Sequence, residues 1–272
     1  MIARNYLWLF LMTLLCGSTQ VLALEDIELT LPSQVDGGHA FYHELLYQSL
    51  QADGYKVIIE IPKEHIPQKR AKKMVSMGQL SLTWLIATAE RNKQFVPVRV
   101  PLTNGLIGKR VALIPPELQT KFDSINNLKD LKNSGLIAGM GINWFDVDVW
   151  QSNQLPVYIQ DGEWRSLYSK LTSTGFVNYF PRGMIEVLNE AKQNPHLAVE
   201  QRLLLVYQKD FYFYLSPQFA HYQSILEKAL LNAQQSGLME RLVKKYWQTT
   251  FEQLKPEGRV VIELALPEHG SQ

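Results

Sequence analysis

Segments typical of β-strands and of α-helices alternate along most of the chain, and this alternation limits the fold more than any other feature of the sequence. Residues 27–31 alternate apolar and polar side chains as a strand does. Residues 40–52 place Phe41 and Leu45 at helical spacing, and Gly54 follows as a stop signal. Further strand-like runs occupy residues 55–61, 81–86, 110–114, 136–140, 156–159, 177–180, 203–207, 211–215 and 260–264, and helix-like runs occupy residues 68–77, 163–172, 184–193, 217–235 and 238–254. This order predicts α/β layers built on mainly parallel sheets.

The first 23 residues have the features of a cleaved secretion signal. Arg4 precedes an apolar run, residues 6–15, that is too short to cross a bilayer, and Val21 and Ala23 suit a peptidase that cuts before Leu24. An uncleaved anchor is the alternative, because the apolar run and the residues after it together approach a spanning length. We therefore expect a signal peptide at residues 1–23 and a periplasmic location.

The charge and cysteine content exclude several classes of protein. The chain has 27 Lys and Arg against 26 Asp and Glu, and its one cysteine, Cys16, follows a leucine too bulky for a lipid-attachment site. Loss of the signal removes Arg4 and Cys16, which leaves 26 basic residues (27 minus 1) against 26 acidic ones and no cysteine. Disulfides and thiol catalysis are then excluded, and no basic excess favours nucleic acid. The basic run at residues 69–73 is interpreted as a solvated helix face.

Two patterns resemble cofactor or metal sites, and both are incomplete. The glycine pair within residues 139–141 begins like a dinucleotide-binding fingerprint, but a tryptophan replaces the third glycine. His39 and His43 lie four residues apart beside Glu44, yet no His-Glu-x-x-His completes a metal site. We expect no cofactor and no metal.

Residues 78–110 carry a family resemblance, and they read GQLSLTWLIATAERNKQFVPVRVPLTNGLIGKR. This segment resembles the family-3 extracellular solute-binding proteins, the periplasmic receptors of amino-acid-type importers. In that family a helix ends at a glycine, a strand leads to a threonine-rich turn with Glu-Arg, and a proline precedes the crossing to a second lobe. Residues 127–131, 139–141 and 237–247 are similar to later family segments in the same order.

The resemblance implies a two-lobed clamshell of type II, a Venus flytrap with strand crossovers between the lobes. Lobe one would comprise residues 24–101 with 207–272, and lobe two residues 102–206. The ligand would lie in the cleft, and closure would be a hinge motion. The implied partners are a small-molecule solute and an inner-membrane ABC transporter or a sensor, and we expect a monomer without catalytic residues.

Arg91 is the first predicted ligand contact. It stands in Thr88-Ala-Glu-Arg91, where the resemblance places the arginine that holds a ligand's α-carboxylate. A guanidinium can give such a group two parallel hydrogen bonds. The alternative is a surface arginine paired with Glu90 or with a neighbouring carboxylate.

Arg182 departs from the family's pattern. Amino-acid receptors usually have an aspartate at this strand-to-helix junction, where it takes the ligand ammonium, and an arginine cannot do so. If Arg91 and Arg182 both face the cleft, the solute is anionic at both ends or lacks a free amine. The alternative is that Arg182 pairs with Glu186 at i,i+4 spacing.

Four further residues complete the predicted site. Trp84, Trp144 and Tyr179 are predicted as aromatic walls, because Trp84 ends a predicted strand and Trp144 stands where a helix begins. Asp146 is a predicted contact that could instead favour the helix N-terminus, and each aromatic ring could instead serve packing. Arg110 is expected to pair near the crossing between the lobes.

The favoured function is the capture of a small polar solute, anionic or carboxylate-bearing, for an importer or sensor. The first alternative is an enzyme on the same scaffold, such as a dehydratase acting on a cyclic acid. It would need a cleft carboxylate or histidine with a shifted pKa, for which Glu186 and His39 are the candidates. The second alternative is a sensory module without transport.

Overall fold

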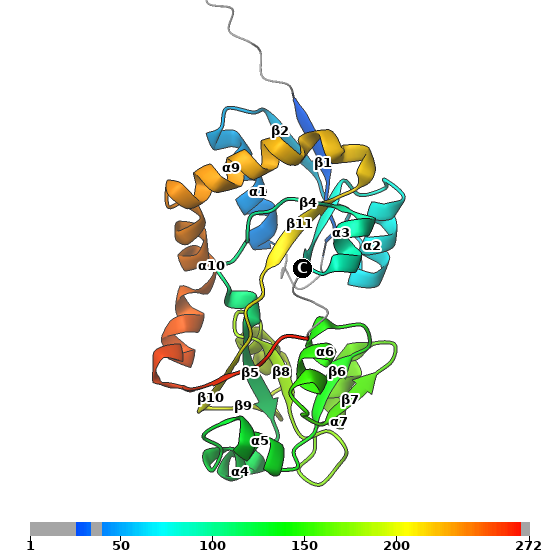
Figure 1. Cartoon of the computed structure of the whole chain (residues 1–272). Helices are drawn as coiled ribbons and strands as arrows, with labels where there is room; N and C mark the ends of the chain where they lie inside the picture. The colour runs from blue at the N-terminus through cyan, green and yellow to red at the C-terminus, as the bar shows by residue number, and fades with distance from the viewer. Residues whose placement is uncertain (1–25, 34–39, 268–272) are drawn as a thin grey trace, which may run out of the picture.

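The computed structural model describes residues 26–33 and 40–267, which fold into two lobes placed one above the other in Figure 1. The helices are α1 (Ala40–Ala52), α2 (Gln68–Ser76), α3 (Ala89–Gln94), α4 (Gln119–Asp123), α5 (Leu128–Asn133), α6 (Phe145–Ser152), α7 (Leu167–Lys170), α8 (Val187–Gln193), α9 (Gln223–Gln235) and α10 (Leu238–Leu254). The strands are β1 (Ile27–Thr30), β2 (Val57–Glu60), β3 (Leu82–Ile86), β4 (Val96–Pro97), β5 (Lys109–Ile114), β6 (Ala138–Gly141), β7 (Val157–Gln160), β8 (Phe180–Gly183), β9 (Ala198–Val199), β10 (Leu203–Val206), β11 (Phe211–Leu215) and β12 (Val260–Glu263).

The predicted signal peptide, residues 1–23 with Arg4 and Cys16, lies outside the described residues. Within residues 26–33 and 40–267, no helix combines the length and the apolar character that a membrane span requires. Most predicted segments appear within two residues of their expected bounds. The predicted strand at 177–180 is shifted, because the strand that pairs with β5 is β8, Phe180–Gly183.

The upper lobe consists of β1–β4, β11, α1–α3, α9 and α10. β1 pairs with β2 in parallel, and β3, β11 and β4 form an antiparallel sheet. Ser81 joins these two groups, since its N–H donates to Thr30 O at 2.8 Å and its Oγ accepts from Thr30 N at 2.9 Å. The predicted apolar face of α1 is buried at Phe41 and Leu45, and Trp247 of α10 packs on Phe41 with ring centroids 4.3 Å apart.

The lower lobe contains β5–β10, β12 and α4–α8. Its main sheet has the order β12-β10-β5-β8, with β9 also paired to β5, and β6 and β7 form a second pair. Gly139 N donates to Tyr179 O at 2.8 Å, which joins β6 to the start of β8. The apolar side chains of these strands pack against α6, where Trp150 is fully buried.

The expectation of mainly parallel sheets is wrong. Of the eight strand pairings among the described residues, β1–β2, β10–β12 and β6–β7 are parallel and the other five are antiparallel. For three of these five antiparallel pairings, the reason is the passage of the chain between the lobes. The chain leaves the upper lobe after β4 and returns after β10, so β5 runs opposite to β10 and β11 runs opposite to β3 and β4.

The two crossing segments are tied to each other at a buried carboxylate. Asp210 accepts hydrogen bonds from Thr103 Oγ1 at 2.6 Å, from Thr103 N at 3.1 Å and from Gly105 N at 2.7 Å. Burial raises the pKa of Asp210, although these hydrogen bonds work in the opposite direction. Asp210 and Thr103 therefore fix the place where the lobes meet.

The division of the chain into residues 24–101 with 207–272 and residues 102–206 remains a proposal, with one change that strand pairing requires. β12 was expected in lobe one, but it pairs with β10 over four residues and so belongs to the sheet of the lower lobe. Ile262 is buried in that lobe's core, and β12 supplies the backbone partners that the edge of β10 needs.

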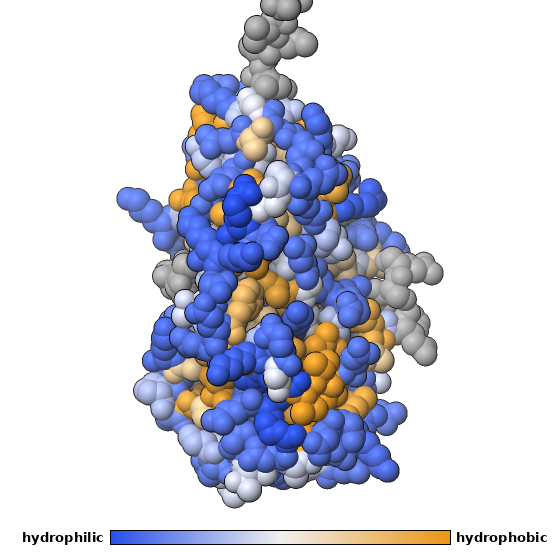
Figure 2. All heavy atoms as spheres, turned by 90° about the vertical axis from the view of Figure 1, so that its left-hand side faces the viewer, coloured by the Kyte–Doolittle hydropathy of each residue, from blue (hydrophilic) through white to orange (hydrophobic). Residues whose placement is uncertain are grey.

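The face of the molecule that carries α10 is hydrophilic over most of its area, with hydrophobic side chains gathered mainly in the lower half (Figure 2). α10 accounts for part of this, because it buries Leu242 and turns Glu240 and Lys244 to solvent, where they form an ion pair at 2.8 Å. An exposed i,i+4 pair of this kind contributes little to stability, so the buried side of α10 is what holds it on α1 and α9.

His43 of α1 lies partly buried inside the upper lobe. Its Nε2 is 2.9 Å from the carbonyl oxygen of Pro32, and its ring centroid is 5.5 Å from that of Trp84. Burial lowers the pKa of His43 below its ordinary value of 6.5, and the hydrogen bond to Pro32 offsets only part of this effect.

We expect the free energy of unfolding to fall as the pH drops below 6.5, because the unfolded chain then binds a proton at His43 that the folded protein does not. The contribution of His43 to the free energy of unfolding is fully present above pH 6.5. It declines by at most about 1.4 kcal/mol per pH unit as the pH falls toward the lowered pKa of the folded state. Urea unfolding of the wild type and of His43→Gln, from about pH 5 to about pH 8, measures it. Parallel stability curves for the two proteins would contradict this assignment.

Candidate functional site

A cavity of about 940 Å³ lies between the two lobes, with α2 and α3 on its upper side and the start of α6 on its lower side. Its upper wall consists of Lys72, Thr88, Ala89, Glu90, Arg91 and Gln94, and its lower wall of Ile142, Asn143, Trp144, Phe145, Val147, Asp148, Gln151, Ser152, Ile159 and Pro267. A cavity of this size is typical of small-molecule sites, and its lining combines charged and polar side chains, which dominate the upper wall, with apolar side chains on the lower wall.

Arg91 lines the upper wall, as predicted. It sits in the first turn of α3, where Thr88 Oγ1 accepts a hydrogen bond from Arg91 N at 3.2 Å and so caps the helix. The guanidinium donates through Nη1 to Ile86 O at 2.5 Å, which orients the side chain. Burial lowers the pKa of Arg91, and Tyr214, Glu90 and Asp148 act in the opposite direction.

The alternative partner of Arg91 is not found. Within residues 26–33 and 40–267, no carboxylate oxygen lies within 4.0 Å of its guanidinium, so Glu90 does not neutralise it by direct contact. A guanidinium has five N–H donors in a planar fork, and one of them is used by Ile86. Arg91 thus presents a partly buried positive charge to the cavity.

Trp144 lines the lower wall, also as predicted. It precedes α6, after Asn143, whose φ of 65° lies in the left-handed region. Its indole packs so closely on Gly141 that an added Cβ there would lie 2.7 Å from the ring. The ring also stacks on Phe180, with centroids 6.0 Å apart. The glycine pair noted in the sequence lies in β6, and Gly141 leaves the room that this tryptophan ring occupies.

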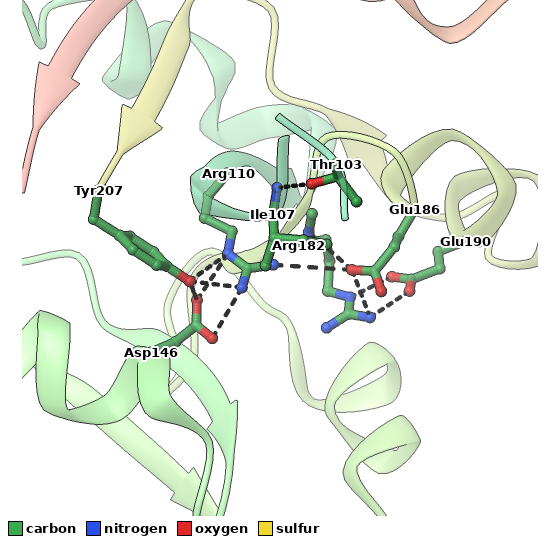
Figure 3. A network of polar contacts seen from close by, with 9 residues as sticks. Thr103, Ile107, Arg110, Asp146, Arg182, Glu186, Glu190 and Tyr207 are labelled. Atoms are coloured by element: carbon green, nitrogen blue, oxygen red, sulfur yellow. Dashed lines mark hydrogen bonds and ion pairs between the residues drawn. The ribbon is translucent and has the colours of Figure 1, made fainter. Parts of the chain in front are cut away.

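Arg182 does not line the cavity, and its predicted place in the ligand site is corrected. Its Nε and Nη2 each donate to Glu190 at 2.6 Å, and Nη2 lies 3.3 Å from Glu186 Oε2 (Figure 3). Burial alone would lower the pKa of Arg182, but Glu190 and then Glu186 raise it overall. The alternative pairing with Glu186 is therefore present, and Glu190, one turn further along, is the closer partner.

Asp146 is likewise turned away from the cavity. Its Oδ1 lies 2.8 Å from Arg110 Nε and accepts a hydrogen bond from the Tyr207 hydroxyl at 2.8 Å (Figure 3). All three residues are buried. The carboxylate is occupied by these partners, so its predicted contact with a ligand is corrected, whereas the expected pairing of Arg110 near the crossing between lobes is found.

The other two predicted aromatic walls do not line this cavity. Tyr179 is fully buried in the lower lobe, where its hydroxyl accepts a hydrogen bond from Trp150 Nε1 at 2.9 Å, so it has no surface to offer a ligand. Trp84 is 5% exposed and stacks on Tyr42, with centroids 4.7 Å apart. Both side chains are packed in the protein interior, which was the alternative given for each of them.

Two charged residues among the cavity residues that were not predicted are Lys72 and Asp148. Lys72 of α2 belongs to the basic run interpreted as a solvated face, and Asp148 of α6 stood between two apolar residues with no motif to mark it. For Lys72, the sequence signal was its position on α2 next to Ala71 and Val75, which form the buried face of the helix.

Glu186, one of the two candidates for other chemistry, does not line the cavity. Glu186 is held against Arg182 and Gly183 N, and His39 lies outside the described residues. Among residues 26–33 and 40–267, no three His, Cys, Asp or Glu side chains are arranged so that they could hold a metal ion. His43 instead faces Pro32 and Trp84.

No family model matches the chain, and no curated protein matches it significantly. Several solved structures are similar to the chain. An ancestral arginine-binding protein bound to arginine is 15% identical, with a TM-score of 0.58 over 81% of this chain and 98% of that one. The ligand-binding core of GluR0 in complex with L-glutamate is 14% identical, with a TM-score of 0.59 over 82% and 99%.

A third similar structure is the substrate-binding protein of an amino-acid ABC transporter from Streptococcus pneumoniae bound to L-arginine. It is 14% identical, with a TM-score of 0.59 over 81% of this chain and 94% of that one. At these identities the likeness concerns the fold, and it extends over nearly the full length of each of these proteins. The α/β fold implied by the resemblance in residues 78–110 is confirmed, and the chain has the two-lobed fold of the periplasmic binding proteins.

Proposed function

We propose that the protein is a divergent, non-enzymatic member of the family-3 solute-binding proteins, and that it holds a small carboxylate-bearing solute between its lobes. The observation behind this proposal is Arg91, a partly buried cation on the wall of the interlobe cavity with no carboxylate within 4.0 Å among the described residues. A carboxylate from the solute would supply the missing counter-charge through charge-assisted hydrogen bonds.

The proposed ligand class is that of amino acids and related carboxylic acids. The similar structures described above hold arginine or L-glutamate, which supports this class. The expectation of a solute anionic at both ends relied on Arg182, whose charge is met by Glu190 and Glu186. The proposal therefore keeps the carboxylate at Arg91 and does not use Arg182.

Capture would proceed by closure of the lobes. Arg91 and α3 belong to the upper wall, whereas Trp144 and α6 belong to the lower wall, so a solute that contacts both favours the closed arrangement. We propose that the protein is exported by residues 1–23, acts as a monomer in the periplasm and delivers its solute to an inner-membrane importer or a sensor. The similarity to substrate-binding proteins of amino-acid ABC transporters supports the importer.

We expect Arg91→Ala to weaken solute binding by roughly ten- to hundred-fold, because it removes charge-assisted hydrogen bonds to the carboxylate. A thermal-shift screen of residues 24–272 against amino acids, dicarboxylates, phosphorylated compounds and sugars finds the solute, since a ligand of the native state raises the apparent Tm. Calorimetry then measures the affinity of each variant. Arg70→Ala is the control, because Arg70 is exposed on α2 outside the cavity.

A screen dominated by neutral sugars, or an unchanged affinity in Arg91→Ala, would refute the role of Arg91. The same samples test the enzyme alternative, because mass spectrometry of the bound solute after incubation detects turnover. A solute recovered intact supports a binding protein.

A further inference from the structure

Lys72 places a second cation in the cavity wall that holds Arg91. α2 carries four basic residues, and their side chains differ in exposure. Lys69, Arg70 and Lys73 are exposed, whereas Lys72 is partly buried and lines the cavity. Ala71 and Val75 anchor the buried face of the same helix, so the position of Lys72 toward the cavity is set by the packing of α2.

Neither cation of this wall is neutralised by a close carboxylate. In the part of the chain that the structure describes, no carboxylate oxygen lies within 4.0 Å of Lys72 Nζ or of the Arg91 guanidinium. Burial lowers the pKa of Lys72, and the charge of Arg91 lowers it further, with Glu90 acting in the opposite direction. The two cations therefore repel each other across the same wall.

The acidic residues of the cavity do not remove this repulsion. Glu90 is exposed beside Arg91, and Asp148 is exposed on α6, on the opposite wall. The upper wall thus has two partly buried cations and one exposed carboxylate, Glu90, and the carboxylate of Asp148 lies on the opposite wall. An anion placed between Lys72 and Arg91 would relieve the repulsion within the wall, and a positive group on the same solute would be favoured near Asp148.

We infer that Lys72 is a specificity-determining residue and that the solute carries a second carboxylate, as dicarboxylic acids and acidic amino acids do. This inference rests on the proposed function, in which Arg91 holds the first carboxylate. Arg91 offers a planar fork suited to bidentate contact, and Lys72 offers a compact charge at the end of a flexible side chain. Because the side chain of Lys72 is flexible, it can meet a second carboxylate at different distances from the first.

The test compares solutes that differ only in the second carboxylate. Calorimetry measures the binding of L-glutamate, L-aspartate and succinate, and of their amide counterparts L-glutamine, L-asparagine and succinamate. At least one diacid should bind the wild type more tightly than its amide by roughly ten-fold or more. Lys72→Gln should abolish that preference by weakening the diacid and leaving the amide nearly unchanged.

Two further variants of α2 complete the experiment. Lys73→Gln removes the same charge from the exposed side of the helix and should keep the preference, whereas Lys72→Arg retains a cation in the cavity and should keep most of it. Their melting temperatures check that the lobes remain folded. Any long-range effect of net charge would appear in Lys73→Gln as well.

Three results would overturn the inference. The wild type could bind none of the diacids, it could bind diacid and amide equally, or Lys72→Gln could weaken both by the same factor. The last result would indicate that Lys72 acts on lobe closure, by attraction to Asp148, and not on the second carboxylate. Failure of the proposed function is distinguishable, because Arg91→Ala would then leave every affinity unchanged.

Discussion

Replacing Glu190 by alanine is expected to lower the free energy of unfolding by about 3–5 kcal/mol, the usual cost of leaving one member of a buried ion pair without its partner. The side chain of Arg182 is 8% exposed, and both of its 2.6 Å hydrogen bonds go to Glu190. Its remaining carboxylate contact would be Glu186 at 3.3 Å, which is itself 41% exposed. Chemical denaturation of the wild type and the variant measures the loss.

Two comparisons identify the cause of that loss. Glu186→Ala removes the more exposed carboxylate and should cost clearly less than Glu190→Ala. The double change Arg182→Met with Glu190→Met removes both charges, and it should recover much of the stability, because an apolar pair needs no counter-charge. The guanidinium lies 5.1 Å from the Trp144 ring centroid and 4.7 Å from that of Trp164, so an apolar side chain suits this position. A double variant no more stable than Glu190→Ala would contradict the explanation.

Gly108→Ala is expected to destabilise the protein by about 2–3 kcal/mol or more, because a forced overlap in a packed region displaces its neighbours. A Cβ at Gly108 would overlap the backbone carbonyl oxygen of Tyr207, and Lys209 O would lie 3.1 Å away. Both obstacles are backbone atoms of the second crossing segment, which cannot rotate aside as a side chain can. The hydrogen bond from Tyr207 N to Gly108 O, 3.0 Å long, would be strained as well.

Gly258→Ala is the matched control, since no heavy atom lies within 4 Å of the added Cβ. It should leave the unfolding midpoint almost unchanged. Equal stabilities for the two alanine variants would show that the crossing segments can separate at Gly108 without cost. A lower midpoint for Gly108→Ala alone supports the close approach of the two segments.

Local sequence signals account for the two predicted site residues that line the cavity, Arg91 and Trp144. Thr88 caps α3 and so fixes the direction of Arg91, and Gly141 at the end of β6 leaves room for the ring of Trp144. Both depend on neighbours within five residues in the chain. The order of strands and helices was predictable for the same reason, because apolar spacing sets each element separately.

Contacts between distant segments explain the errors. Asp146 forms an ion pair with Arg110 and accepts a hydrogen bond from Tyr207, and Tyr179 accepts one from Trp150. These partners are far apart in the chain, so no local sequence pattern predicts the contacts. The direction of the strands depends on where the chain crosses between lobes, which periodicity does not encode. For Lys72, a run of basic residues on a short helix does not reveal which side chain another lobe will face.

The pairing of β12 with β10 determines which fragments of the chain can fold without an open sheet edge, and when the sheet of the lower lobe is complete. β12 follows every other element in chain order, yet it completes the sheet of the lobe whose other strands are made long before it. Until β12 has paired with it, the apolar strand Leu203–Val206 has an open edge that another chain could pair with. A fragment ending at α10 would keep that edge, and residues 102–206 expressed alone would do the same. Proteolytic trimming after Leu254 should therefore promote self-association, and it would also remove Pro267 from the lower wall of the cavity.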